Sequence, residues 1–149
     1  MNVAKKANVE EKNPALNVER VSVDELKLDP RNARLHPDRN LAAIRASLER
    51  FGQQKPIVVK KDGTVIAGNG TIAAAKALGW TTISIVRSDL VGAQATAFAI
   101  ADNRSAELAE WDDENLKKQL VAIQADDAEL AQATGFLDDE IAQLCGDVD

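Results

Sequence analysis

Residues 56–79, PIVVKKDGTVIAGNGTIAAAKALG, contain the signals that decide the fold class. The apolar run Pro56–Val59 is typical of a buried strand with proline at its edge. The Asp62-Gly63 pair predicts a hairpin turn, which makes Val65–Ala67 the partner strand. The turn Gly68–Thr71 then leads directly into an alanine-rich helix. A strand hairpin joined to a helix by a glycine-rich turn is therefore the centre of the predicted domain.

The flanking sequence predicts strands mixed with helices first and helices alone afterwards. Strands are expected at Arg20–Val23, continued after a turn by Leu26–Leu28, and at Thr82–Val86. A helix is expected from Leu41 to its stop at Gly52. The remaining periodic segments predict helices at Gly92–Glu110, Asp113–Gln124, Glu129–Ala133 and Asp138–Cys145. This order indicates an α+β fold.

The composition limits the class of protein without excluding nucleic acid as a partner. The chain has 149 residues, enough for one domain, with 45% hydrophobic and 3% aromatic residues. Its net charge of −6 is divided unevenly. Residues 1–88 carry 15 basic and 9 acidic side chains, whereas residues 89–149 carry 3 basic and 15 acidic ones. If DNA binds, we expect it on the basic N-terminal half, at Arg31–Arg50, weakly and with strong salt dependence.

Cysteine, histidine and hydropathy exclude several other classes. Cys145 is the lone cysteine and His36 the lone histidine, so an internal disulfide, a zinc cluster and a multi-histidine metal site are impossible. No apolar run is long enough to span a bilayer, so we expect no membrane partner and a cytoplasmic location. Residues 1–18 lack apolar periodicity and are expected to form a flexible tail.

The turn Gly68–Thr71 is the first candidate binding site. Gly68 and Gly70 permit close approach of the backbone to a ligand, and the N-terminus of the following helix favours an anion such as phosphate. Asn69 or Thr71 could equally be no more than the helix N-cap. Considered alone, this turn favours capping over phosphate binding.

A second candidate site lies within the helix expected at Gly92–Glu110. Asp102 and Asn103 offer the oxygen ligands that suit magnesium, and Arg104 could contact phosphate. Considered alone, the motif favours the alternative of a solvated helix face, on which Glu107 pairs with Arg104 or Asn103 caps a turn.

The loop between Pro30 and Pro37 is rich in groups that can contact a ligand. Arg31, Asn32 and Arg34 could bind phosphate or brace the loop, and these alternatives are equally favoured. His36 is expected at the surface of the loop, and a catalytic role for it is the less favoured interpretation.

Four ordered motifs together resemble the ParB N-terminal domain family, whose fold is shared with sulfiredoxin. They are Asn32-Ala33-Arg34, Lys55–Lys60, Gly68–Ala75 and Ala101–Arg104. The resemblance covers about residues 20–145 and predicts a small mixed sheet with packed helices. It is strongest to ParB-like domains of phages and plasmids, some of them called nucleases, and to those linked to DNA methyltransferases.

The resemblance implies a nucleotide-binding domain. Partition ParB proteins bind CTP with magnesium and act as DNA clamps. Carried over by position, Gly68–Thr71 falls on their triphosphate box, and Asp102 and Asn103 fall on the Glu-Asn pair that serves the metal and hydrolysis. Asp102 and Asn103 are therefore the expected catalytic and metal-binding residues, and Arg31, Arg34 and Arg104 the expected phosphate ligands.

This chain also departs from the family pattern. Asn69-Gly70-Thr71 replaces the Glu-Arg-Arg of partition proteins and the His-Gly-Arg usual in phage-type relatives, so charged donors are missing from the box. Sulfiredoxin chemistry is excluded because its cysteine belongs in this turn, far from Cys145.

The leading hypothesis is a nucleotide-binding domain, of CTP or ATP type and assisted by Mg²⁺, in a DNA-associated process of a phage, plasmid or mobile element. The alternatives are a DNA nuclease or phosphotransferase using the same pocket, or a degenerate adaptor without enzymatic activity. The domain is expected at residues 19–110, with a C-terminal helical extension at 111–149 packed on it. The apolar stripes of that extension are expected to cover the sheet. Docking of a partner protein or a second copy is the alternative.

Overall fold

A four-stranded mixed sheet forms the centre of the computed structural model, which describes residues 12–146. Its strands are β1 (Val18–Ser22), β2 (Ile57–Lys60), β3 (Val65–Ala67) and β4 (Thr82–Ser88), in the order β1-β4-β2-β3. β2 runs parallel to β4 and antiparallel to β3, and β1 runs antiparallel to β4. The α+β fold with a mixed sheet is therefore confirmed.

The helices account for most of the remaining chain. A 3₁₀ turn, η1, spans Val23–Glu25. The α-helices are α2 (Asp38–Phe51), α3 (Asn69–Ala77), α4 (Gly92–Leu108), α5 (Asp113–Asp126), α6 (Ala128–Gln132) and α7 (Asp138–Gly146). The helices and the hairpin predicted from the sequence are confirmed with shifts of a few residues at their ends. No helix among the described residues is both long and apolar enough to cross a membrane.

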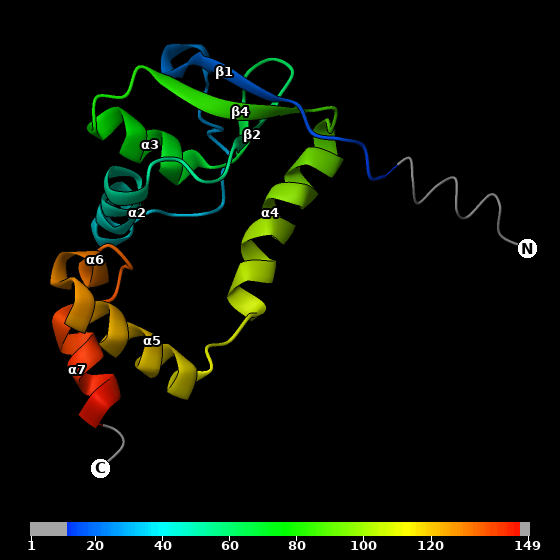
Figure 1. Ribbon diagram of the computed structural model, residues 1–149. Helices are drawn as coiled ribbons and strands as arrows, with labels where there is room; N and C mark the ends of the chain where they lie inside the picture. Colours follow the sequence, from blue (N-terminus) through cyan, green and yellow to red (C-terminus); the bar gives the residue numbers. More distant parts are fainter. Residues whose placement is uncertain (1–11, 147–149) are drawn as a thin grey trace, which may run out of the picture.

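The main core lies between the sheet and α2 and α3, which lie together on one side of it (Figure 1). β2 alternates buried and half-buried residues, and Val59 is completely buried. Ile72 in the first turn of α3 and Ile85 in β4 have no exposed surface either. The first turn of α3 is therefore anchored by the core.

The predicted strand at Leu26–Leu28 is wrong. η1 comes just before this segment, and within the segment only Lys27 pairs, with Thr64, in an isolated bridge. Ser22 caps η1 by accepting from the backbone N–H of Asp24 at 3.3 Å, and this turn ends β1. β1 starts at Val18, two residues before the expected start at Arg20. The last residue of the expected tail, residue 18, therefore belongs to β1. Residues 1–11 of that tail lie outside the described residues.

The C-terminal helices form a small core of their own. Leu120, Ala131 and Ile141 are buried together, surrounded by Leu116, Ile123, Phe136 and Leu144. The expectation that their apolar stripes cover the sheet is therefore wrong, because α5, α6 and α7 pack on one another. Asp112 caps α5 and Asp127 caps α6, in each case by accepting backbone N–H groups.

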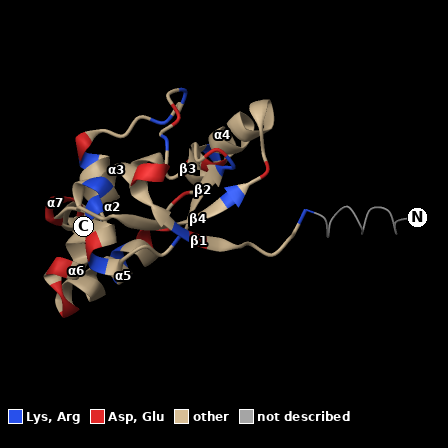
Figure 2. Cartoon of the chain, turned by 90° about the horizontal axis from the view of Figure 1, so that it is seen from above, with Lys and Arg blue, Asp and Glu red and all other residues tan. Residues whose placement is uncertain are grey.

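Ion pairs join this C-terminal group to α2. Arg39 pairs with Glu140 of α7, and Arg50 pairs with Asp127 at 2.7 Å. Figure 2 shows the basic segments of α2 beside the acidic segments of α6 and α7. α4 meanwhile extends away from the sheet as a long helix with a single buried residue, Ala95 (Figure 1). One long face of α4 is therefore available to line a cavity.

Candidate functional site

The turn between β3 and α3 is held tightly against the core. Gly68 has φ 114°, a left-handed conformation that glycine adopts without strain. A Cβ at Gly68 would lie 2.9 Å from Cγ1 of Ile57, so no other residue fits there without displacing β2. Gly68 is also the N-cap of α3 and contributes no side chain to it. The interpretation of Asn69 or Thr71 as N-cap is therefore wrong.

The first turn of α3 leaves polar groups available to a ligand. The first helical hydrogen bond runs from the N–H of Ile72 to the carbonyl of Gly68 at 2.9 Å. The N–H groups of residues 69–71 consequently have no partner within the helix. Oδ1 of Asn69 is buried and finds no hydrogen-bond partner among residues 12–146. Buried polar atoms are rarely left unpaired, so this oxygen is available to accept a hydrogen bond from a donor group of a ligand.

Local hydrogen bonds organise the loop that follows η1. The N–H of Arg31 donates to Oδ1 of Asp29 at 2.9 Å. Asn32 closes the next turn, since its Oδ1 accepts from the N–H of Arg34 and its Nδ2 donates to the carbonyl of Arg34, both at 3.2 Å. Asn32 therefore braces the loop, and the guanidinium groups of Arg31 and Arg34 extend from a fixed backbone.

α4 presents the second candidate motif toward this loop. Nδ2 of Asn103 donates to the carbonyl of Ala99 at 3.0 Å, which leaves its Oδ1 as the atom available to a ligand. Asp102 is exposed, and its carboxylate forms no ion pair within the described part of the chain. A carboxylate and an amide oxygen on adjacent residues are the donors that Mg²⁺ accepts from proteins.

Two adjoining cavities bring all the predicted site residues together. One of about 230 Å³ is lined by Arg31, Arg34, Asn69, Asn103 and Arg104. The other, of about 150 Å³, is lined by residues 68–71 with Asp102 and again Arg34, Asn69 and Asn103. Residues from the loop, the turn and α4, far apart in the sequence, thus line two cavities that share Arg34, Asn69 and Asn103.

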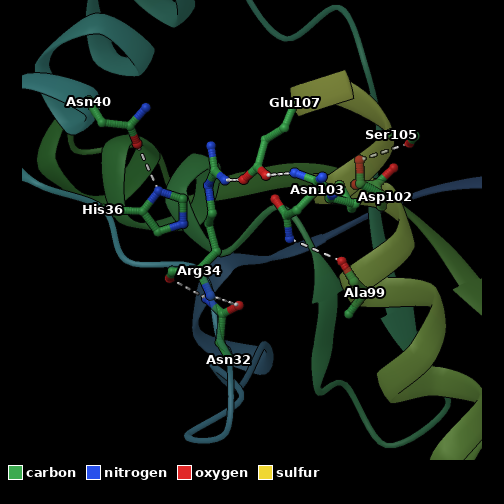
Figure 3. A network of polar contacts seen from close by, with 10 residues as sticks. Asn32, Arg34, His36, Asn40, Ala99, Asp102, Asn103, Ser105 and Glu107 are labelled. Carbon is green, nitrogen blue, oxygen red and sulfur yellow. Dashed lines mark hydrogen bonds and ion pairs between the residues drawn. The ribbon is translucent and has the colours of Figure 1, made fainter. Parts of the chain in front are cut away.

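Glu107 of α4 lies beside these cavities and binds both Arg34 of the loop and Arg104 of its own helix (Figure 3). One of its carboxylate oxygens accepts from Arg34, and the other accepts from Nη1 of Arg104 at 3.2 Å. These guanidinium groups, Arg104 first and then Arg34, hold the pKa of the Glu107 carboxyl below its ordinary value. The sequence predicted only the contact with Arg104, because Arg34 lies 73 residues away.

His36 lies deeper than the sequence indicated. It is half-buried, lines the smaller cavity and is held by Asn40, whose Oδ1 lies 2.7 Å from Nδ1 (Figure 3). Sequence reasoning also missed the apolar wall of the larger cavity. Its residues Ile66, Thr96, Ala99 and Ile100 include three from α4. Their spacing with Asn103 and Glu107 follows one face of a helix, and this was the signal that could have identified them.

The basic stretch expected to meet DNA is largely paired with carboxylates. Of its five arginines, Arg31, Arg34, Arg39 and Arg50 each have an acidic partner. Arg45 forms no ion pair with an acidic side chain among residues 12–146. The structure therefore presents much less free positive charge at residues 31–50 than the sequence suggested.

The similarities to known proteins agree with this fold. The model of the ParB N-terminal domain matches residues 7–104. The Escherichia coli K12 protein YnaK, named as a ParB-like nuclease domain-containing protein, is 30% identical over 64 residues, which are 43% of this chain and 74% of YnaK.

Solved structures show the same fold. The C-terminally truncated chromosome-partitioning protein ParB from Caulobacter crescentus, complexed with CTP-γ-S, superimposes with a TM-score of 0.73 at 17% identity, covering 86% of this chain and 76% of ParB. A Pnob8-like ParB-N domain gives a TM-score of 0.53 at 21% identity, covering 91% of this chain and 62% of that one. This chain belongs to the ParB N-terminal domain family.

Proposed function

We propose that this domain binds a nucleoside triphosphate of the CTP or ATP type together with Mg²⁺, in a DNA-associated process. The observation that carries this proposal is the convergence of the turn Gly68–Thr71, the arginine loop and α4 on two adjoining cavities. The ParB of Caulobacter crescentus, which shares the fold, was crystallised with CTP-γ-S, and this supports the proposal.

We place the phosphates of the nucleotide at the first turn of α3. Free N–H groups and the positive end of the helix dipole favour an anion there. Arg34 and Arg104 can add charge-assisted hydrogen bonds from the loop and from α4. These two side chains come from elements outside the box and supply the charge that Asn69, Gly70 and Thr71 lack.

Magnesium fits the pair Asp102 and Asn103. Mg²⁺ usually keeps several waters and takes one or two protein ligands together with substrate phosphates. Asp102 and Asn103 line the same cavity as the turn Gly68–Thr71, so one ion could contact both them and a phosphate. Mg²⁺ would neutralise phosphate charge there and would support hydrolysis if the domain turns its nucleotide over.

Binding is favoured over phosphodiester cleavage by a two-metal mechanism. YnaK carries the word nuclease in its name, but no group of three or more His, Cys, Asp or Glu side chains that could hold a metal is found in residues 12–146. Two-metal nucleases need such a group of ligands. The pair Asp102 and Asn103 suits one hydrated magnesium ion that is held partly by the nucleotide.

The proposal is tested by isothermal titration of the chain with CTP, ATP and GTP in the presence of Mg²⁺. We expect binding of at least one nucleotide, and a weakening of about tenfold or more in Asp102→Ala and in Asn103→Ala. Asp113→Ala, which removes an acidic residue at the start of α5, is the matched control and should bind like the unaltered chain. The proposal fails if none of the three nucleotides binds, or if Asp102→Ala and Asn103→Ala both leave the affinity unchanged.

Glu107→Gln should strengthen nucleotide binding. Glu107 neutralises Arg34 and Arg104, the two arginines best placed for phosphate, so it competes with the ligand for them. Glutamine is the same size without the charge, so the arginines become free to pair with phosphate. We expect a several-fold lower Kd for CTP in the same titration. Weaker binding in Glu107→Gln would show instead that the carboxylate holds the arginines in the geometry that the ligand needs.

A further inference from the structure

The imidazole of His36 occupies the space that a side chain at Gly70 would fill. A Cβ built on Gly70 would lie 2.7 Å from Cε1 and 2.8 Å from Nδ1 of His36, and 2.9 Å from Cδ1 of Ile44. Gly70 is buried, so the ring is packed directly against the backbone of the first turn of α3. The His36 side chain, which comes from the loop, thus fills the space that a side chain at position 70 would occupy.

The orientation of the ring is fixed at one of its nitrogens. Oδ1 of Asn40, in the first turn of α2, accepts the hydrogen bond from Nδ1 of His36 at 2.7 Å. No hydrogen bond to Nε2 occurs among residues 12–146. The ring lines the smaller cavity beside Gly70 and Thr71, which puts it within the part of the site assigned to the phosphates.

We infer that His36, as an imidazolium, donates from Nε2 to the phosphates of the bound nucleotide. This inference rests on the proposed nucleotide-binding function. Because Nδ1 already donates to Asn40, Nε2 can donate to a phosphate oxygen only when both ring nitrogens carry a proton. A phosphate beside the ring favours that form.

The charges around the ring are few. Arg34 and Asp102 are the charged groups that line the cavity with His36, and they have opposite signs. From α2 and α3 the cavity is lined by uncharged residues, namely Ile44, Asn69, Gly70 and Thr71. The phosphates, and the Mg²⁺ proposed at Asp102 and Asn103, are therefore the groups whose arrival changes the electrostatic environment of the ring.

The test measures the Kd for CTP with Mg²⁺ at about pH 6 and about pH 8, on either side of the range in which imidazole ordinarily titrates. His36→Ala removes the ring, His36→Gln keeps a polar group of similar reach that does not titrate, and Leu35→Ala alters an exposed neighbour as the control. Phosphate itself titrates in this range, so the quantity compared is the ratio of each variant's Kd to that of the unaltered chain at the same pH.

We expect both His36 variants to bind CTP about tenfold more weakly at about pH 6, with the difference nearly gone at about pH 8. Leu35→Ala should match the unaltered chain at both values. Equal affinities at about pH 6, or a loss that is the same at both pH values, would overturn the role of His36 while leaving nucleotide binding intact. If the unaltered chain binds no nucleotide at either pH, the proposed function fails, and this inference fails with it.

Discussion

Ile72→Ala is expected to destabilise the fold by about 2–5 kcal/mol, the range for removing a buried isoleucine side chain beyond Cβ. Ile72 is completely buried in the main core and belongs to the first turn of α3. Its loss leaves a cavity directly beneath the turn Gly68–Thr71. Urea unfolding followed by circular dichroism measures the free energy of unfolding.

Leu108→Ala is the control for this substitution. Leu108 ends α4 and is 64% exposed, so its truncation should change the free energy of unfolding by less than about 0.5 kcal/mol. Equal losses in the two variants would contradict the position of Ile72 in the core.

Arg34→Ala is expected to weaken nucleotide binding by about 10- to 100-fold, the equivalent of one charge-assisted hydrogen bond. Arg34 lines both cavities and extends from a loop fixed by Asn32. Its removal also leaves the Glu107 carboxylate with one arginine partner fewer. Titration with CTP and Mg²⁺ measures the change.

Two further variants make this prediction specific. Arg34→Lys keeps the charge and loses the planar fork, so its affinity should fall between that of the unaltered chain and that of Arg34→Ala. Arg45→Ala removes an exposed arginine of α2 that lines neither of the two cavities, and its affinity should be unchanged. A similar loss in Arg45→Ala and Arg34→Ala would point to a general effect of charge in place of a contact at the site.

The sequence predicted the local elements well because their signals are local. The Asp62-Gly63 turn and the stop at Gly52 each depend on a few neighbouring residues. The prediction failed at Leu26–Leu28 because apolar alternation over three residues does not distinguish a strand from an extended segment after a 3₁₀ turn.

Long-range contacts explain what the sequence could not predict at the site. The motifs identified the residues of the turn and of α4, and the structure places them around two cavities with shared lining residues. The pairing of Arg34 with Glu107 and the packing of His36 on Gly70 join residues that are far apart in the chain. The apolar stripes of α5–α7 were equally compatible with covering the sheet and with packing on one another, since periodicity gives a buried face and not its partner.

A crystal structure of the chain soaked with CTP and Mg²⁺ is the decisive measurement. We expect density for the phosphates against the N–H groups of residues 69–71, with the metal between them and the pair Asp102 and Asn103. Nucleotide density elsewhere on the molecule, or an empty turn at a CTP concentration that saturates binding in solution, would contradict this expectation.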